Sequence, residues 1–91
     1  MSNTELALET LQKMRKKRFA SSAPVIKVPY EEQILAHLLA YGTITPADAY
    51  RLYGCMRLGA RIHDLRKKGI LIHTWRMPNK RGGTYARYTL E

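Results

Sequence analysis

The sequence predicts an α+β fold, in which a three-helix core is followed by a C-terminal β-hairpin and preceded by one extra helix. Apolar residues recur at helical spacing over residues 3–18, 30–41 and 56–68. Residues 84–90 instead alternate between two sets of side chains, which is the period of a half-buried strand. Glycine and proline stand between these segments, where they suit the ends and starts of helices.

The first two predicted helices differ in their apolar faces. Residues 3–18 present a thin stripe, formed by Ala7, Leu11 and Met14. Such a helix is marginal on its own, so we expect it to pack against a neighbour, either this domain or a second chain. Residues 30–41 present a broad apolar face, and Gly42 suits the left-handed residue that ends a helix.

The segment between these helices divides the chain into two predicted parts. Residues 21–24 have the composition of a linker, and residues 25–28 that of a short extended piece. We expect an N-terminal helix and linker over residues 1–29 and a domain over residues 30–91. A chain of 91 residues has room for one modest core.

A short helix begins at a clear start signal. Thr45 suits the N-cap, Pro46 the first helical position, and Asp48 the third position of a capping box. We expect this helix to end at Tyr53, because Gly54 follows it.

The next helix, over residues 56–68, is expected to turn an apolar stripe toward the core. The stripe consists of Leu58, Ile62 and Leu65. Gly69 ends this helix, and residues 70–76 have the β-branched and aromatic composition of a strand. Residues 77–83 form a basic loop, which leads into the second strand over residues 84–90.

The positive charge of the chain is extreme and unevenly placed. The formal net charge is +9 at pH 7, and residues 51–90 carry ten basic residues and one acid. A second basic cluster lies within residues 13–18. Such a charge indicates a polyanionic partner, with nucleic acid ahead of an anionic membrane surface. The membrane alternative is weak because the helix over residues 3–18 lacks a bulky apolar face.

Several other classes are disfavoured by what the sequence lacks. Cys55 is the only cysteine and the histidines show no ligand spacing, so we expect no disulfide and no metal site. No apolar run approaches the roughly 18 residues of a membrane span, and the N-terminus lacks a secretory signal. We therefore expect a cytoplasmic protein. No nucleophile–base or carboxylate pair stands out, so we expect neither an enzyme nor a cofactor.

The order of elements and three short stretches indicate a known architecture. Two helices joined by a short glycine-containing turn are typical of a helix-turn-helix, and the hairpin adds the wing of a winged helix. The stretches are ITPADA at 44–49, YGCMRL at 53–58 and ARIHDLR at 60–66. Over about residues 30–90 the chain resembles the small helix-turn-helix proteins common in bacteriophages and prophages. The resemblance implies a winged helix-turn-helix, DNA as the ligand and a phage-related origin.

The helix over residues 56–68 is the expected reader of a DNA major groove. Its face away from the core and the basic loop region are predicted to contact DNA, through Met56, Arg57, Ala60, Arg61, Asp64, Lys67, Lys68, Arg76, Lys80 and Arg81. Arg57 is the best candidate for reading a guanine, and Ala60 is small enough to let the helix approach base edges. Lys67 and Lys68 suit phosphate contacts.

Several of these residues have a structural alternative. Arg61 is equally well explained by an ion pair with Asp64, and the basic loop by a solvated turn. Trp75 serves either hairpin packing or base stacking, and Cys55 is predicted to be a small buried filler. The basic cluster within residues 13–18 is either a solvated helix end or a DNA-binding arm.

Two functions from different classes follow from these observations. The first is a sequence-specific double-stranded DNA-binding protein, either a phage regulator or a recombination accessory factor. The second is a protein-binding module, such as a phage-encoded inhibitor of a host protein. For the first function, residues 3–18 are expected to mediate homodimerisation and to place the adjoining basic cluster near DNA.

Overall fold

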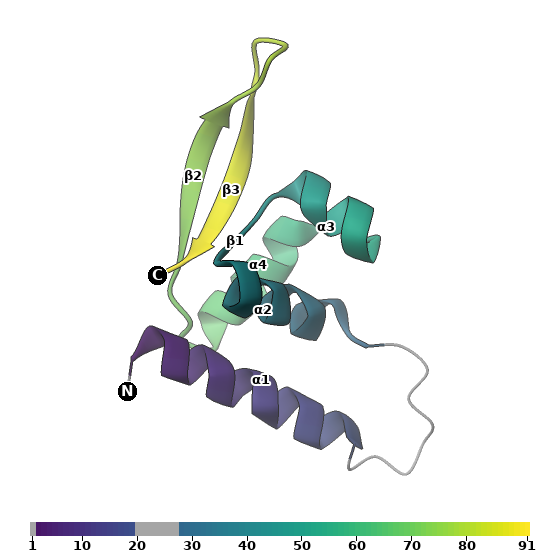
Figure 1. Cartoon of the computed structure of the whole chain (residues 1–91), viewed down its shortest axis with the longest axis vertical. Coiled ribbons are helices and arrows are strands. Elements are labelled where there is room, and N and C mark those ends of the chain that lie inside the picture. The colour runs from purple at the N-terminus through teal and green to yellow at the C-terminus, as the bar shows by residue number, and fades with distance from the viewer. Residues whose placement is uncertain (1, 20–27) are drawn as a thin grey trace.

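The computed structural model describes residues 2–19 and 28–91 (Figure 1). Along this part of the chain the elements are α1 (Asn3–Phe19), α2 (Tyr30–Tyr41), β1 (Thr43–Ile44), α3 (Pro46–Tyr53), α4 (Leu58–Lys67), β2 (Ile72–Pro78) and β3 (Thr84–Leu90). The predicted α+β fold, with three core helices, a C-terminal hairpin and an extra N-terminal helix, is confirmed. The predicted linker over 21–24 and most of the predicted extended piece over 25–28 lie outside the described residues.

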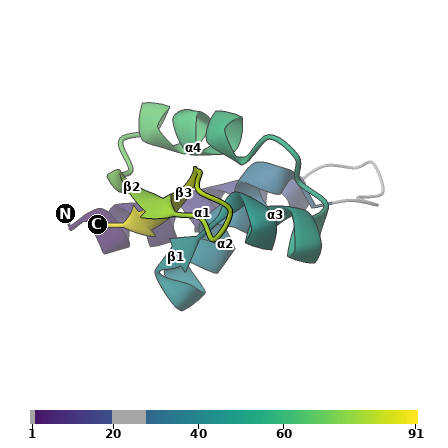
Figure 2. The same ribbon diagram turned by 90° about the horizontal axis from the view of Figure 1, so that it is seen from above.

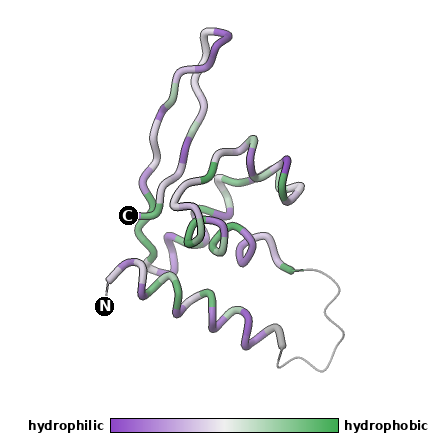
Figure 3. Tube along the Cα trace, in the orientation of Figure 1, coloured by the Kyte–Doolittle hydropathy of each residue, from purple (hydrophilic) through white to green (hydrophobic). Residues whose placement is uncertain are grey.

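The core lies between α2, α4 and the base of the hairpin. It contains the apolar stripe predicted for α4, which consists of Leu58, Ile62 and Leu65. Leu35 and Leu38 of α2 are fully buried in the same cluster, and Tyr88 of β3 packs against it. Figure 3 shows apolar stretches gathered in this region, whereas the tip of the hairpin is hydrophilic.

The three strands form one antiparallel sheet in the order β1-β3-β2. The strand β1 was not predicted, because two residues are too few to show a period of two. It forms because the chain turns at Gly42, whose φ of 79° is left-handed, and pairs Ile44 with Tyr88. The backbone N–H of Leu90 also donates to the carbonyl oxygen of Gly42, at 3.0 Å.

The first strand of the hairpin was predicted two residues too early. It was expected over 70–76 and is found over Ile72–Pro78. The ladder begins with Ile72 opposite Leu90, because the backbone N–H of Leu71 donates instead to Oδ1 of Asn3 in α1, at 2.7 Å. The carbonyl oxygen of Leu71 still accepts from the N–H of Glu91, at 3.1 Å, so Asn3 replaces only one of the two possible ladder bonds at this position.

The start of α3 follows the predicted capping box. The backbone N–H of Asp48 donates to Oγ1 of Thr45 at 3.2 Å, and the N–H of Thr45 donates to Oδ2 of Asp48 at 3.3 Å. Burial raises the pKa of the Asp48 carboxyl, but hydrogen bonds from Arg51 and Thr45 outweigh this and leave the pKa below its ordinary value. The helix ends at Gly54, whose φ of 72° is left-handed, as predicted.

The helix α4 is shorter than predicted. It was expected over 56–68 and spans Leu58–Lys67, so Met56 and Arg57 precede its first turn. The backbone N–H of Cys55 donates to the carbonyl oxygen of Ala49, and its side chain is buried in the core, as predicted for a small filler. Anchoring Cys55 in this way leaves Met56 and Arg57 to complete the turn before helical geometry resumes.

The helix α1 shares the core of the rest of the chain. Ala7 and Leu11 are buried in the main cluster and Met14 packs against it, so the predicted thin stripe is covered by this chain. Nε of Arg15 lies 3.5 Å from Oε1 of Glu32, a buried carboxylate of α2. The neighbour that the first helix was expected to need is therefore α2.

The side chain of Asn3 connects the start of α1 to the open end of the hairpin through hydrogen bonds. Its Nδ2 donates to the carbonyl oxygens of Leu71 and Glu91, and its Oδ1 accepts from the N–H of Leu71. The side-chain amide thus bridges two chain segments that are 68 and 88 residues away in sequence.

Replacing Asn3 by alanine is expected to lower the free energy of unfolding by about 1–2 kcal/mol, because these hydrogen bonds are lost together. Urea unfolding followed by circular dichroism measures the change. Thr4→Ala, at the exposed neighbouring position, is the matched control and should shift stability by less than about 0.5 kcal/mol. Equal stability of the two variants would show that the amide bridge does not hold α1 in place.

Candidate nucleic-acid interface

The helix α4 and the β2–β3 hairpin form one continuous structure. The Arg66 side chain donates from both Nε and Nη2 to the carbonyl oxygen of Ile72, at 3.1 and 2.7 Å, and from Nη2 to Oγ1 of Thr74 at 2.7 Å. The hydroxyl of Tyr88 lies close to Gly59 on the same side of the sheet. Figure 2 looks onto the tip of the hairpin and shows α4 alongside the strands.

Some of the predicted contact residues are engaged within the protein. Arg61 forms an ion pair with Asp64, with 3.3 Å between Nη2 and Oδ2. Lys68 forms an ion pair with Glu31 at the start of α2. The ion pair of the structural alternative for Arg61 is present, and the charge of Lys68 is compensated by Glu31. Contact of either residue with DNA stays a prediction.

Other predicted contact residues keep an uncompensated charge. Among the predicted contact residues, all of which the structure describes, five exposed basic residues form no ion pair: Arg57, Lys67, Arg76, Lys80 and Arg81. They lie at both ends of α4, on β2 and at the tip of the hairpin. The exposed positions of α4 between the two ends include Ala60 and His63.

The tip of the hairpin is closed by its own backbone. The N–H of Asn79 donates to the carbonyl oxygen of Gly83 at 2.7 Å, and the N–H of Gly82 to the carbonyl oxygen of Asn79 at 3.1 Å. The N–H of Arg81 donates to Oδ1 of Asn79 at 3.3 Å. These bonds define the loop while the side chains of Lys80 and Arg81 remain exposed.

The start of α4 is open to an anion. Arg57 is its N-cap and makes no side-chain capping bond, and no acid occupies the first turn. A hollow of about 370 Å³ lies beside it and is lined by Tyr30, Gly54, Cys55, Met56, Arg57 and Arg61. The N–H groups and positive dipole end of a helix favour negatively charged groups at such a place.

The residues of the basic cluster within residues 13–18 differ in whether they form ion pairs. Lys13 forms an ion pair with Glu9 along α1, with 3.1 Å between Nζ and Oε1, and Arg15 pairs with Glu32. Lys16 and Lys17 are exposed. The side chain of Arg18 lies outside the described part of the chain, so the choice between a solvated helix end and a DNA-binding arm stays a prediction.

Two residues that were not among the predicted contacts, Tyr85 and Arg87, lie on the same face of the hairpin as Trp75. Tyr85 is exposed, and Nε of Arg87 is buried without a hydrogen-bond partner. The alternation of β3 puts both on one face, and the hairpin register sets Arg87 opposite Trp75. The alternation along residues 84–90 is the sequence signal that groups Tyr85 with Arg87, but only the strand register shows that they share a face with Trp75.

The described residues form neither a metal site nor a membrane span. No group of three or more His, Cys, Asp or Glu residues in this part of the chain is arranged to hold a metal ion. No described helix is long and apolar enough to cross a membrane.

A helix-turn-helix that continues into a three-stranded sheet with a basic hairpin defines a winged helix-turn-helix domain. A family model described as "Winged helix-turn-helix domain" matches residues 29–91, and the chain belongs to this family. Membership indicates DNA binding, and domains of this kind are typically non-enzymatic DNA-binding modules. No curated protein and no solved structure matches the chain.

Proposed function

We propose that the protein binds double-stranded DNA in a sequence-specific manner, as a cytoplasmic regulator or recombination accessory factor encoded by a phage or prophage. The observation that carries the proposal is the placement of uncompensated charge on α4 and the hairpin, while Arg61 and Lys68 are paired. In this arrangement α4 enters the major groove, and the hairpin tip lies over the neighbouring backbone or minor groove.

The two elements have different roles in this proposal. Arg57 and the exposed Met56 lie at the N-terminal end of α4, from which recognition helices contact base edges. Ala60 lets the helix approach closely, and Arg57 reads a guanine. Lys67 and the hairpin cations contact phosphates, which add affinity without sequence preference.

Homodimerisation through residues 3–18 stays a prediction, and the structure narrows how it can occur. The apolar stripe of α1 is already buried against α2. A second chain would therefore have to contact the outer surface of α1, where Leu8 is exposed.

A second candidate function is a protein-binding module. It is favoured by three large exposed side chains on α2 and α3, which are Tyr41, Tyr50 and Leu52. Retention on heparin followed by a mobility shift with random duplex at low salt separates the two functions. Failure in both assays would favour the protein-binding module.

The decisive experiment is selection of bound fragments from a random duplex pool. On the recovered site, Arg57→Ala is expected to cost about 1–3 kcal/mol of binding free energy, and much less on random DNA. The double variant Lys80→Ala, Arg81→Ala should weaken binding to both about equally, because phosphate contacts carry no sequence information. An unchanged ratio of specific to random affinity in Arg57→Ala would show that α4 does not read the sequence.

A further inference from the structure

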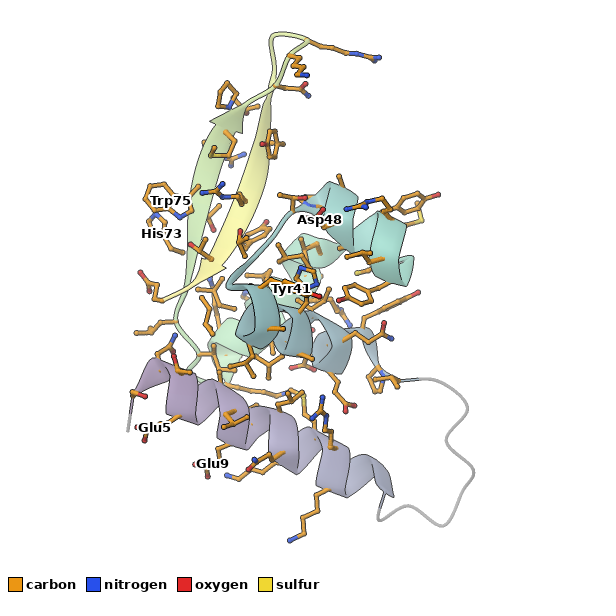
Figure 4. All side chains as sticks on the ribbon, in the orientation of Figure 1. Glu5, Glu9, Tyr41, Asp48, His73 and Trp75 are labelled. Atoms are coloured by element: carbon orange, nitrogen blue, oxygen red, sulfur yellow. The ribbon has the colours of Figure 1, made fainter. Side chains whose placement is uncertain are left out.

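The hairpin has an outer face that the proposed duplex interface does not use. The side chains on this face are His73, Trp75 and Met77 from β2 and Tyr85, Arg87 and Thr89 from β3. The opposite face carries Ile72 and Tyr88, which pack into the core. Figure 4 shows Trp75 and His73 projecting from β2 on the side away from the helices.

Two aromatic rings are held exposed on this outer face. The side chain of Trp75 is 48% exposed and that of Tyr85 is 40% exposed. Nε1 of Trp75 donates to Oγ1 of Thr89 at 2.8 Å, across the strand pair, and the His73 ring packs edge-on with 4.4 Å between ring centroids. These contacts restrain the indole while half of its surface remains in water.

The strand register makes the positions of the two rings diagonal neighbours, and Tyr85 also borders a hollow lined by residues 45–48 at the start of α3. Trp75 faces Arg87 across the sheet and Met77 faces Tyr85, so Trp75 and Tyr85 occupy diagonal positions on one face. Such positions lie about 7–8 Å apart, within reach of large aromatic side chains. A ligand with successive flat groups can therefore engage both rings.

The charge around these rings indicates an anionic ligand. Residues 72–91 contain four basic residues and one acid, Glu91, whose Oε1 lies 4.0 Å from Nδ1 of His73. Arg87 forms no ion pair within the described part of the chain, and its Nε is buried without an acceptor. The guanidinium of Arg87 therefore keeps an uncompensated charge on this face, and phosphate is well matched to a guanidinium.

We propose that the outer face of the hairpin binds an unpaired DNA strand, whose bases stack on Trp75 and Tyr85 and whose backbone contacts Arg87. Exposed aromatic rings beside cations are the combination that binds single strands with little sequence preference. Because α4 lies on the other side of the hairpin, a duplex on α4 and an unpaired strand on the outer face can be bound together. The choice of DNA over RNA rests on the proposed function.

The chain carries its own probe for this site. Trp75 is the only tryptophan, so stacking of a base on it should quench the intrinsic fluorescence of the full-length protein. Titration with an oligothymidylate is expected to give saturable quenching. A duplex with an unpaired tail should bind more tightly than the same duplex with blunt ends.

Substitutions at two separate tyrosines serve as the test variant and its control. Tyr85→Ser keeps the Trp75 probe and should weaken oligothymidylate binding about 5- to 150-fold, the effect of removing one stacking ring. Tyr50→Ser removes a ring that is 62% exposed on α3 and should leave this binding unchanged. Both variants should bind blunt duplex with the affinity of the parent protein, which would show that their fold is intact.

The outcomes separate this inference from the proposed function. If blunt duplex binds but oligothymidylate leaves the fluorescence unchanged, or Tyr85→Ser binds it as tightly as the parent, the outer face is not a strand-binding site. Tighter binding of oligouridylate of equal length would overturn the choice of DNA. If oligothymidylate quenches but no duplex binds, the strand site stands and the proposed reading of duplex fails.

Discussion

Replacing Ile62 by alanine is expected to lower the free energy of unfolding by about 2–5 kcal/mol. Ile62 is fully buried in α4, within the cluster that also holds Leu35 and Leu38 of α2. Truncation removes buried methylene and methyl groups and leaves a cavity that close-packed neighbours fill only in part. Domains of this size are stable by only about 5–15 kcal/mol, so the variant loses a large share of the total.

Urea unfolding followed by circular dichroism measures this effect. Met56→Ala is the matched control, because Met56 is 83% exposed and its truncation should change stability by no more than about 0.5 kcal/mol. The slope of the transition should stay the same in both variants. A variant at Ile62 that unfolds at the midpoint of the parent would mean that α4 is not packed on α2 in solution.

Affinity for duplex DNA is expected to fall about 500-fold when monovalent salt rises from 50 to 200 mM. The expectation follows from the five uncompensated basic residues Arg57, Lys67, Arg76, Lys80 and Arg81. At a slope of about −0.9 per phosphate contact, five contacts give a log–log slope of about −4.5. Charge counting in residues 51–90 alone predicts roughly five to eight contacts and a slope of about −4 to −7. The lower end of that range is expected because Arg61, Arg66 and Lys68 are engaged inside the protein.

Fluorescence anisotropy of one labelled duplex across a salt series gives the slope. The double variant Lys80→Ala, Arg81→Ala should reduce its magnitude by about 1.8, which corresponds to two lost phosphate contacts. Lys68→Ala removes the same kind of charge from an ion pair and should change the slope little. A flat salt response of the parent protein would exclude nucleic acid as its main ligand.

The features that were predicted correctly are those encoded by neighbouring residues. The range of α2 was predicted from its apolar spacing and the left-handed Gly42 that follows it. The capping box at Thr45 and Asp48 and the end of α3 at Gly54 are equally local, since they depend on side chains within a few residues. The family resemblance over about residues 30–90 agrees with the match to residues 29–91.

The features that were missed depend on partners distant in the chain. At the start of β2, the N–H of Ile70 donates to the end of α4 and that of Leu71 donates to Asn3. The strand β1 forms only through its pairing with β3. The start of α4 shifted because Cys55 is anchored to Ala49 and to the core.

The candidate interface also has features that the sequence predicted and features that only the tertiary structure decided. Composition and order along the chain were enough to indicate a basic winged helix-turn-helix, because charge and helical spacing are properties of the sequence. Which cations remain uncompensated was decided in three dimensions, since the partner of Lys68 is Glu31 in another helix and Arg66 is bound to the strand it supports. The exposed rings of Trp75 and Tyr85 likewise became one surface only through the pairing of β2 with β3, because a strand places side chains on a common face but only its partner fixes which of them are neighbours.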